Sequence, residues 1–209
     1  MGSACVSLAI LLGLTACSTR TFALPPAELD TLLRVDTPVA TLLAIDRIED
    51  AGNPAAGPWL LAIQCDAARP LDLRARAAAA LVGLGYPDGQ NFCVAVLAGQ
   101  LRSSKARDQA QRLPISERWA FARELAVRAL RTRLLQAKRV PPPYDVNYGA
   151  PDLRTAAAAF ERELRRAPPL TPAATRGELA ARVPRTPPAG FTADAWQDAR
   201  TRCLNSARP

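Results

Sequence analysis

The sequence predicts an all-α protein of short helices, followed by one long basic helix and a Pro-rich tail of further short helices. Apolar residues recur every three or four positions along most of the chain, as they do on the buried face of a helix. Threonine or glycine before proline marks several helix starts, and glycine marks several ends. The 209 residues are 49% hydrophobic, which is too apolar for a wholly disordered chain and fits one domain with or without a tail.

The first segment has the features of a secretory signal. Residues 1–16 carry no charged side chain, and residues 6–16 are an uninterrupted run of small and apolar residues. As a helix this run would rise about 16 Å, roughly half the hydrocarbon thickness of a bilayer, so it is too short for an ordinary membrane span. An apolar run of this length followed by small residues is typical of the region before a signal-peptide cleavage site.

The end of this segment, Leu14-Thr15-Ala16-Cys17, resembles the lipobox of bacterial lipoproteins. In that family the cysteine is acylated and cleavage falls before it, so the resemblance implies a signal peptide at 1–16, lipidation of Cys17 and attachment to the membrane through the N-terminal lipid. Ser18, where an aspartate would retain such proteins in the inner membrane, implies an outer-membrane position facing the periplasm. The Lys or Arg usual near the start is absent. The alternatives are an apolar helix buried in the core and an uncleaved anchor.

Residues 17–36 are expected to form a tether with one short helix, whose apolar face carries Leu29, Leu32 and Leu33. Thr37-Pro38 predicts the start of the next helix, because a hydroxyl cap precedes a proline at the first helical position. Gly52 predicts its end. A further helix is expected to begin at Gly57-Pro58, or earlier at Asn53-Pro54, and to end near Cys65.

A clearer helical hairpin follows. Residues 73–85 carry an apolar stripe that ends at Gly85, residues 86–89 (Tyr-Pro-Asp-Gly) predict a turn, and a return helix is expected to reach about Leu101. The Arg at the head of the first helix, its run of alanines and the Gly-rich turn resemble the Ala-rich HEAT-type repeats of bacteria. Residues 39–64 fit a degenerate preceding copy, with a period of 33 positions. The resemblance implies HEAT-like hairpins around residues 39–101, within an α-helical domain over 37–140. An unrelated helical bundle is the alternative.

The longest helix is predicted from Ser116, or from the turn at Pro114, to about Lys138, and it carries most of the positive charge. Residues 101–140 contain eleven basic and three acidic residues, which equals the whole chain's net charge of +8. The candidate residues for binding an anion or an acidic partner are Arg118, Arg123, Arg128, Arg131 and Arg133. A solvated face is the other reading. The export signal and the scarcity of aromatic residues among the arginines argue against nucleic acid.

The segment 141–209 is expected to be a Pro-rich tail, because it holds 11 of the 19 prolines. Short helices are predicted over residues 151–166, from Thr171-Pro172 to about Arg182, and from Thr192 to Cys203. In the last of these, Thr192 is a candidate cap, and Phe191 and Trp196 stand at hydrophobic-staple spacing. The tail either wraps over the core or is partly disordered.

Cysteine usage leaves two interpretations open. Once Cys5 leaves with the signal and Cys17 takes lipid, Cys65, Cys93 and Cys203 remain. Cys65 and Cys93 fall on neighbouring predicted helices and are the best candidates for a disulfide, whereas three buried free thiols would also be ordinary. No Cys-x-x-Cys spacing occurs and histidine is absent, so no metal site and no cofactor are expected.

Catalytic patterns are weak. The absence of histidine excludes His-dependent triads, and neither a Gly-rich phosphate loop nor a dinucleotide fingerprint is present. The carboxylate pairs Glu49/Asp50 and Glu161/Glu163 are explained by solvated helix faces, and Ser103-Ser104-Lys105 lacks the setting that Ser-Lys catalysis needs. We therefore expect a non-enzymatic, membrane-tethered envelope lipoprotein that acts as a scaffold for an unknown envelope protein. The alternatives are a module that binds anionic lipid or glycan through the basic 101–140 face, and an enzyme of unrecognised type.

Overall fold

The computed structural model describes residue 31 and residues 37–101, 115–144 and 153–209. The expected signal segment, Cys17, the Leu29–Leu33 helix face and Ser103-Ser104-Lys105 lie outside these residues. The described helices confirm the all-α class, and no strand occurs among them. They are α2 (Pro38–Ala51), the 3-10 helix η1 (Pro54–Ala56), α3 (Gly57–Cys65), α4 (Leu71–Gly83), α5 (Pro87–Leu97), α7 (Ile115–Gln136), α8 (Leu153–Arg165), α9 (Arg176–Arg182) and α10 (Ala193–Ser206).

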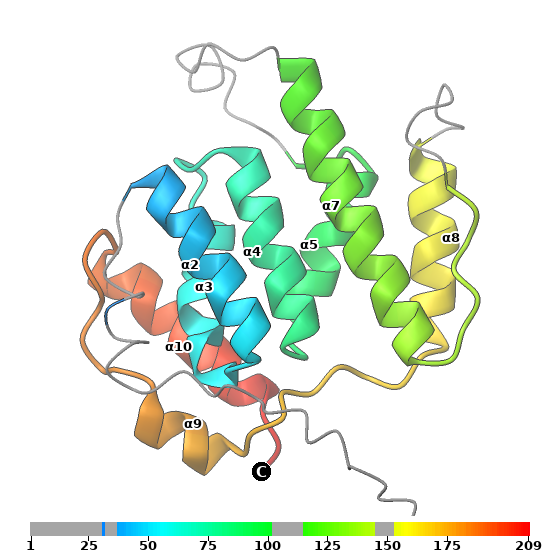
Figure 1. The fold of residues 1–209 in the computed structure, drawn as a ribbon. Coiled ribbons are helices and arrows are strands. Elements are labelled where there is room, and N and C mark those ends of the chain that lie inside the picture. The colour runs from blue at the N-terminus through cyan, green and yellow to red at the C-terminus, as the bar shows by residue number, and fades with distance from the viewer. Residues whose placement is uncertain (1–30, 32–36, 102–114, 145–152) are drawn as a thin grey trace, which may run out of the picture.

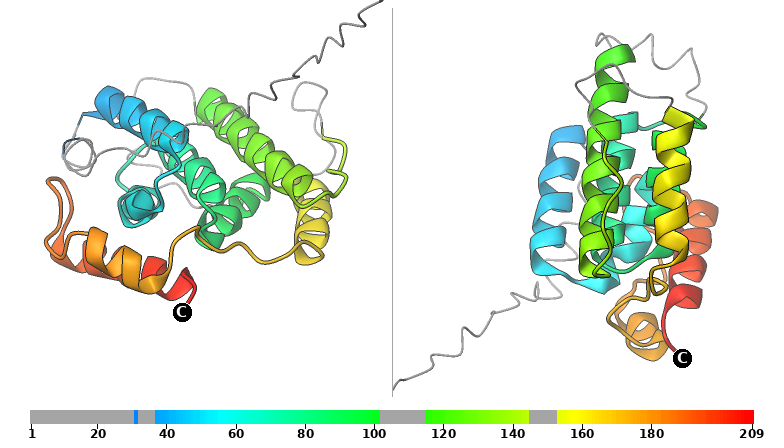
Figure 2. Two further views of the ribbon diagram at one scale, coloured as in Figure 1. Left: turned by 60° about the horizontal axis from the view of Figure 1, so that its bottom comes forward. Right: turned by 90° about the vertical axis from the view of Figure 1, so that its right-hand side faces the viewer.

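The helices form two layers around α4. Helices α2, α4 and α7 lie side by side in the front layer, as Figure 1 shows, and all three run in the same direction. Helices α3, α5 and α8 lie behind them, and α10 packs on the outer side of α3 (Figure 2). Helix α4 therefore touches α2 and α7 within its own layer, and α3 and α5 in the other. The HEAT-like repeat assignment itself stays a prediction.

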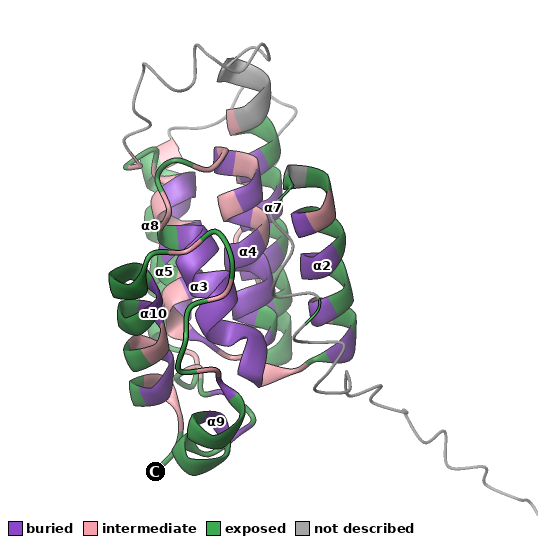
Figure 3. Cartoon of the chain, turned by 90° about the vertical axis from the view of Figure 1, so that its left-hand side faces the viewer, coloured by how far each residue is buried: buried purple, intermediate pink, exposed green. Residues whose placement is uncertain are grey.

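Two hydrophobic clusters share α4. Different faces of α4 contribute to the two clusters. Leu73, Ala77 and Leu81 belong to the first, and Leu71, Ala78 and Val82 belong to the second. The small alanines allow neighbouring helices to approach α4 from several sides. Figure 3 shows the result, because α3 and α4 are buried around most of their surface while α2 exposes one side.

The Pro-rich segment belongs to the same core. Phe160 of α8 is buried in the second cluster, and Trp196 of α10 is buried in the first, against α3. The segment 141–209, predicted as a Pro-rich tail, therefore contributes buried residues to both clusters. No helix in the described part of the chain is both long and apolar enough to cross a bilayer.

The predicted ends of several helices are confirmed. Thr37 accepts a hydrogen bond from the N–H of Ala40 at 3.3 Å, and Gly52 ends α2 with φ of 61°. At the last helix, Thr192 accepts from the N–H of Ala195 at 3.3 Å, and the rings of Phe191 and Trp196 lie 6.3 Å apart. Helix α10 passes Cys203 and ends at Ser206.

Three predicted boundaries are wrong. Residues 86–89 are not a turn, because α5 begins at Pro87 and the chain reverses at Gly85, whose φ is 87°. Proline suits the first position of a helix, since that N–H needs no helical partner. Helix α5 also ends at Leu97 and not near Leu101. Helix α9 begins at Arg176 instead of Thr171-Pro172, because Thr175 and Glu178 form a reciprocal capping box there.

Candidate binding groove

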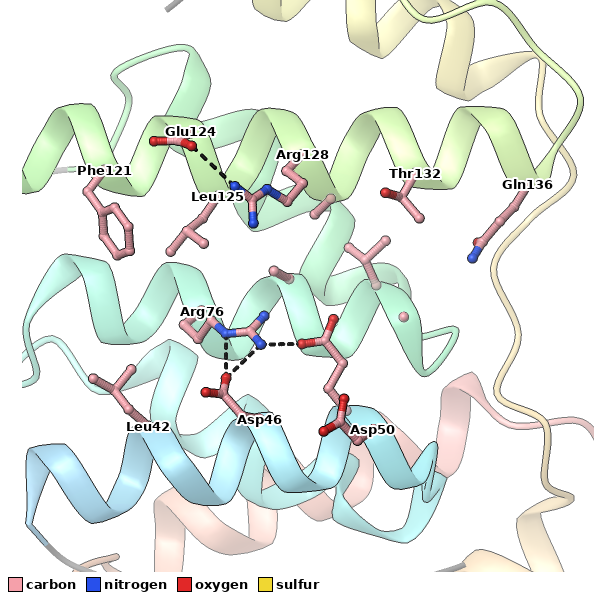
Figure 4. A pocket seen from close by; sticks show the side chains of 15 residues that line it. Leu42, Asp46, Asp50, Arg76, Phe121, Glu124, Leu125, Arg128, Thr132 and Gln136 are labelled. Carbon is pink, nitrogen blue, oxygen red and sulfur yellow. Dashed lines mark hydrogen bonds and ion pairs between the residues drawn. The ribbon is translucent and has the colours of Figure 1, made fainter. Parts of the chain in front are cut away.

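A groove of about 650 Å³ runs along α4 between α2 and α7. Figure 4 shows that α2 and α7 form its two walls and that Arg76 of α4 projects between them. The lining of α7 extends from Phe121 to Gln136, which is about 22 Å of helix at 1.5 Å per residue.

The floor of the groove is made of small and apolar residues. Ala79, Val82 and Gly83 come from α4, and Ala129 comes from α7. Gly83 is exposed, and a Cβ built on it would meet one atom only, the Glu49 carboxylate oxygen at 4.0 Å. The floor therefore carries the least side-chain volume where α4 ends.

The wall formed by α2 is acidic. Asp46, Glu49 and Asp50 line it, and Arg76 reaches across from α4 to bind two of them. The Arg76 Nη2 atom lies 2.6 Å from Asp46 Oδ1 and 2.5 Å from Glu49 Oε2. Asp50 is exposed, and no hydrogen bond or ion pair joins it to another residue in the described part of the chain.

The wall formed by α7 carries one internal ion pair and an apolar end. Arg128 Nη2 lies 3.2 Å from Glu124 Oε1, and both side chains are exposed. With four carboxylates against two guanidiniums, the lining has a net charge of −2 in a chain of net charge +8. At one end of the groove, the exposed side chains of Leu42 and Phe121 (37% and 52% of their surface) form an apolar rim (Figure 4).

The arginines chosen from the sequence do not form one basic face. The Arg118 side chain lies outside the described residues. Arg123 stacks at 5.3 Å over Trp119. Arg131 donates to the carbonyl oxygen of Tyr144 at 2.9 Å. Arg133 is buried and donates to the carbonyl oxygen of Pro168, so it cannot contribute to a binding surface.

The proposed Cys65–Cys93 bridge is not formed in the structure, where Cys65, Cys93 and Cys203 are free thiols. Cys65 is exposed at the end of α3, and Arg202 of α10 donates to its Sγ atom at 3.7 Å. Cys93 lies in the second cluster, on the far side of α4 from the first. Burial raises the pKa of Cys93 to about 12. The two helices are neighbours, but these two side chains are directed into different surroundings.

The carboxylate pair Glu161/Glu163, considered above as a catalytic pattern, forms ion pairs with neighbouring arginines. Glu161 pairs with Arg165 at 3.2 Å, and Glu163 pairs with Arg166 at 3.0 Å. In the described part of the chain, no group of three His, Cys, Asp or Glu side chains is arranged to hold a metal ion.

Sequence reasoning missed the groove as a site. It placed Glu49/Asp50 on a solvated face and did not single out Arg76, which falls within the helix predicted over residues 73–85. Comparison with known protein families, with curated proteins and with solved structures finds no match for this chain.

Proposed function

We propose that this protein is a lipid-anchored scaffold of a bacterial cell envelope, held by Cys17 and docking a partner protein in the α2–α4–α7 groove. The docking part of the proposal rests on the groove. It is long, open and lined from three separate helices, and its apolar floor and rim are flanked by charged walls. Apolar centres with polar margins are characteristic of protein-binding surfaces.

The anchoring half rests on the lipobox-like Leu14-Thr15-Ala16-Cys17. Each buried methylene of an acyl chain contributes about 0.8 kcal/mol, so two or more chains hold a folded domain to a bilayer. Such an anchor would leave the helical body on the membrane surface, facing the extracytoplasmic space.

Fractionation tests the anchor. In cells, Cys17→Ser or treatment with globomycin, which inhibits lipoprotein signal peptidase, should block processing and leave an unprocessed precursor. Wild-type protein should be released from membranes by detergent and not by high salt. Processing that is indifferent to both treatments would contradict the lipid anchor.

A second function is supported by a cationic cavity of about 620 Å³ between residues 138–143 and α8. Lys138, Arg139 and Arg162 line it, with Glu163 as the single carboxylate. Arg139 lies 3.3 Å and Arg162 3.8 Å from Glu163, whereas the side chain of Lys138 has no ion-pair partner among the described residues. Val140 at its rim exposes 85% of its surface. Cations beside an exposed apolar side chain are typical of a surface that binds anionic lipid.

Vesicle co-sedimentation tests this second function. A chain that begins at Ser18, and so lacks both the apolar signal segment and the acylated cysteine, should bind vesicles that contain phosphatidylglycerol and not pure phosphatidylcholine. Lys138→Glu with Arg162→Glu should weaken this binding, and Arg182→Glu with Arg185→Glu, the same change of charge on two exposed residues away from the cavity, should not. Equal loss in both variants would show a general effect of net charge and would contradict a specific site.

A further inference from the structure

We propose that the α2–α4–α7 groove binds an amphipathic helix of the partner protein, with a narrow face of alanine, glycine and leucine and with Lys or Arg along the flank that meets α2. The inference rests on the docking function proposed above and specifies the chemistry of the partner.

The backbone of the groove favours a helix over an extended peptide. All three lining segments are α-helices whose N–H and C=O groups bond within the helix, and no strand edge is present in the described residues. An extended peptide would find no backbone partners on this surface, whereas a helix brings its backbone hydrogen bonds with it. The lining along α7, about 22 Å, matches four turns of such a helix.

The floor of the groove allows a partner helix to approach closely. Ala79, Gly83 and Ala129 present little side-chain volume, so a helix with alanine, glycine or a few leucines on one face can approach closely. The apolar rim of Leu42 and Phe121 gives one larger apolar residue of the partner a place at that end of the groove.

The charges of the groove select a basic flank. The guanidinium of Arg76 is already bound by Asp46 and Glu49, and that of Arg128 by Glu124. Asp50 remains unpaired among the described residues, and the net charge of the lining is −2. A Lys or Arg on the partner would complete the acidic wall, whereas a carboxylate or phosphate there would be repelled.

Peptide binding tests the inference. The full chain is purified, in phosphatidylcholine nanodiscs if it is lipidated and in buffer if it is not, so that the result does not depend on the anchor. Three fluorescent 18-residue peptides serve as probes: a Leu/Ala-striped helix with Lys and Arg flanks, the same stripe with Glu flanks, and a scrambled basic sequence. The striped basic peptide should bind about tenfold more tightly than either of the others.

Variants separate the groove from the rest of the surface. At Gly83 a Cβ atom would meet no backbone atom within 4 Å, so a larger side chain can be placed there without moving a helix. Gly83→Trp therefore fills the floor of the groove and should weaken binding about tenfold. Thr132→Trp, on the exposed α7 wall, is a second obstruction that should weaken binding if Gly83→Trp fails to fold. Gly177→Trp places the same bulk in open space on α9 and should leave binding unchanged. Asp50→Asn should reduce the preference for the basic peptide.

Three results would overturn the inference. They are equal binding of the basic and acidic striped peptides, equal binding by Gly83→Trp, Thr132→Trp and Gly177→Trp, and a chain dimer that Gly83→Trp dissociates, since the occupant would then be a second copy. None of them bears on the anchor, because the readout is independent of lipidation.

Discussion

At the scale of the residue, several arginines join separate segments of this fold. Arg74 donates to the carbonyl oxygen of Gln64 at 2.8 Å, and Arg133 and Arg131 each donate to a backbone carbonyl of a following segment. Arg202 joins α10 to Asp88 of α5. A sequence shows the number of arginines but not their partners. The charge excess of residues 101–140 therefore predicted a binding face. The carboxylates that line the groove gave no such signal in the sequence.

Thiol labelling tests the residue-scale description of the cysteines. In the folded protein at pH 8, iodoacetamide should alkylate exposed Cys65 and leave Cys93 and Cys203 unmodified until urea is added. Thiolate is the reactive form, and burial raises the pKa of both Cys93 and Cys203, so little thiolate forms on either at that pH. Mass spectrometry of the labelled peptides gives the count. A Cys65–Cys93 disulfide in non-reduced peptides would contradict the free-thiol structure.

At the scale of the element, helix caps were readable from the sequence and helix crossings were not. Thr37, Gly52 and Thr192 act through hydrogen bonds to residues three or four positions away, so a local pattern reveals them. Gly89 was assigned to a turn because it follows Tyr-Pro-Asp. It lies inside α5, where a Cβ would come within 2.4 Å of the carbonyl oxygen of Ala78 in α4. That requirement depends on a contact between two helices, which no local pattern contains.

Substitution of Gly89 tests the α4–α5 crossing. Gly89→Ala should lower the free energy of unfolding by about 1–3 kcal/mol, because the added methyl meets backbone atoms that cannot yield without moving a helix. Gly177→Ala is the matched control, since its Cβ meets nothing within 4 Å and alanine favours a helix. Urea denaturation followed by circular dichroism gives both values. Equal stability of the two variants would mean that α4 and α5 are not in close contact at this position.

At the scale of the whole molecule, α4 organises two cores that the Pro-rich segment closes. The sequence predicted helices in 141–209 but left open whether they pack. The structure buries Phe160 in one cluster and Trp196 in the other. The groove also exists only at this scale, because α2 and α7 are distant in sequence and meet opposite edges of α4. The sequence placed each lining residue on a helix, but it gave no sign that these residues lie around one groove.

Removal of the α10 anchor tests this arrangement. Trp196→Ala should lower the free energy of unfolding by about 3–5 kcal/mol, since a fully buried indole that packs against α3 leaves a large cavity. Asp198→Ala changes an exposed residue of the same helix and should have a small effect. Denaturation curves distinguish the two. Unchanged stability of Trp196→Ala would show that the C-terminal helix does not pack on the core.

The mass of the mature N-terminal peptide tests the central claim most directly, because it shows whether this scaffold is tethered by lipid. Protein from the membrane fraction should begin at Cys17 and carry the added mass of a diacylglyceryl group, with or without a further acyl chain. An unmodified peptide that runs from Thr15 through Cys17, recovered from soluble protein, would contradict the account.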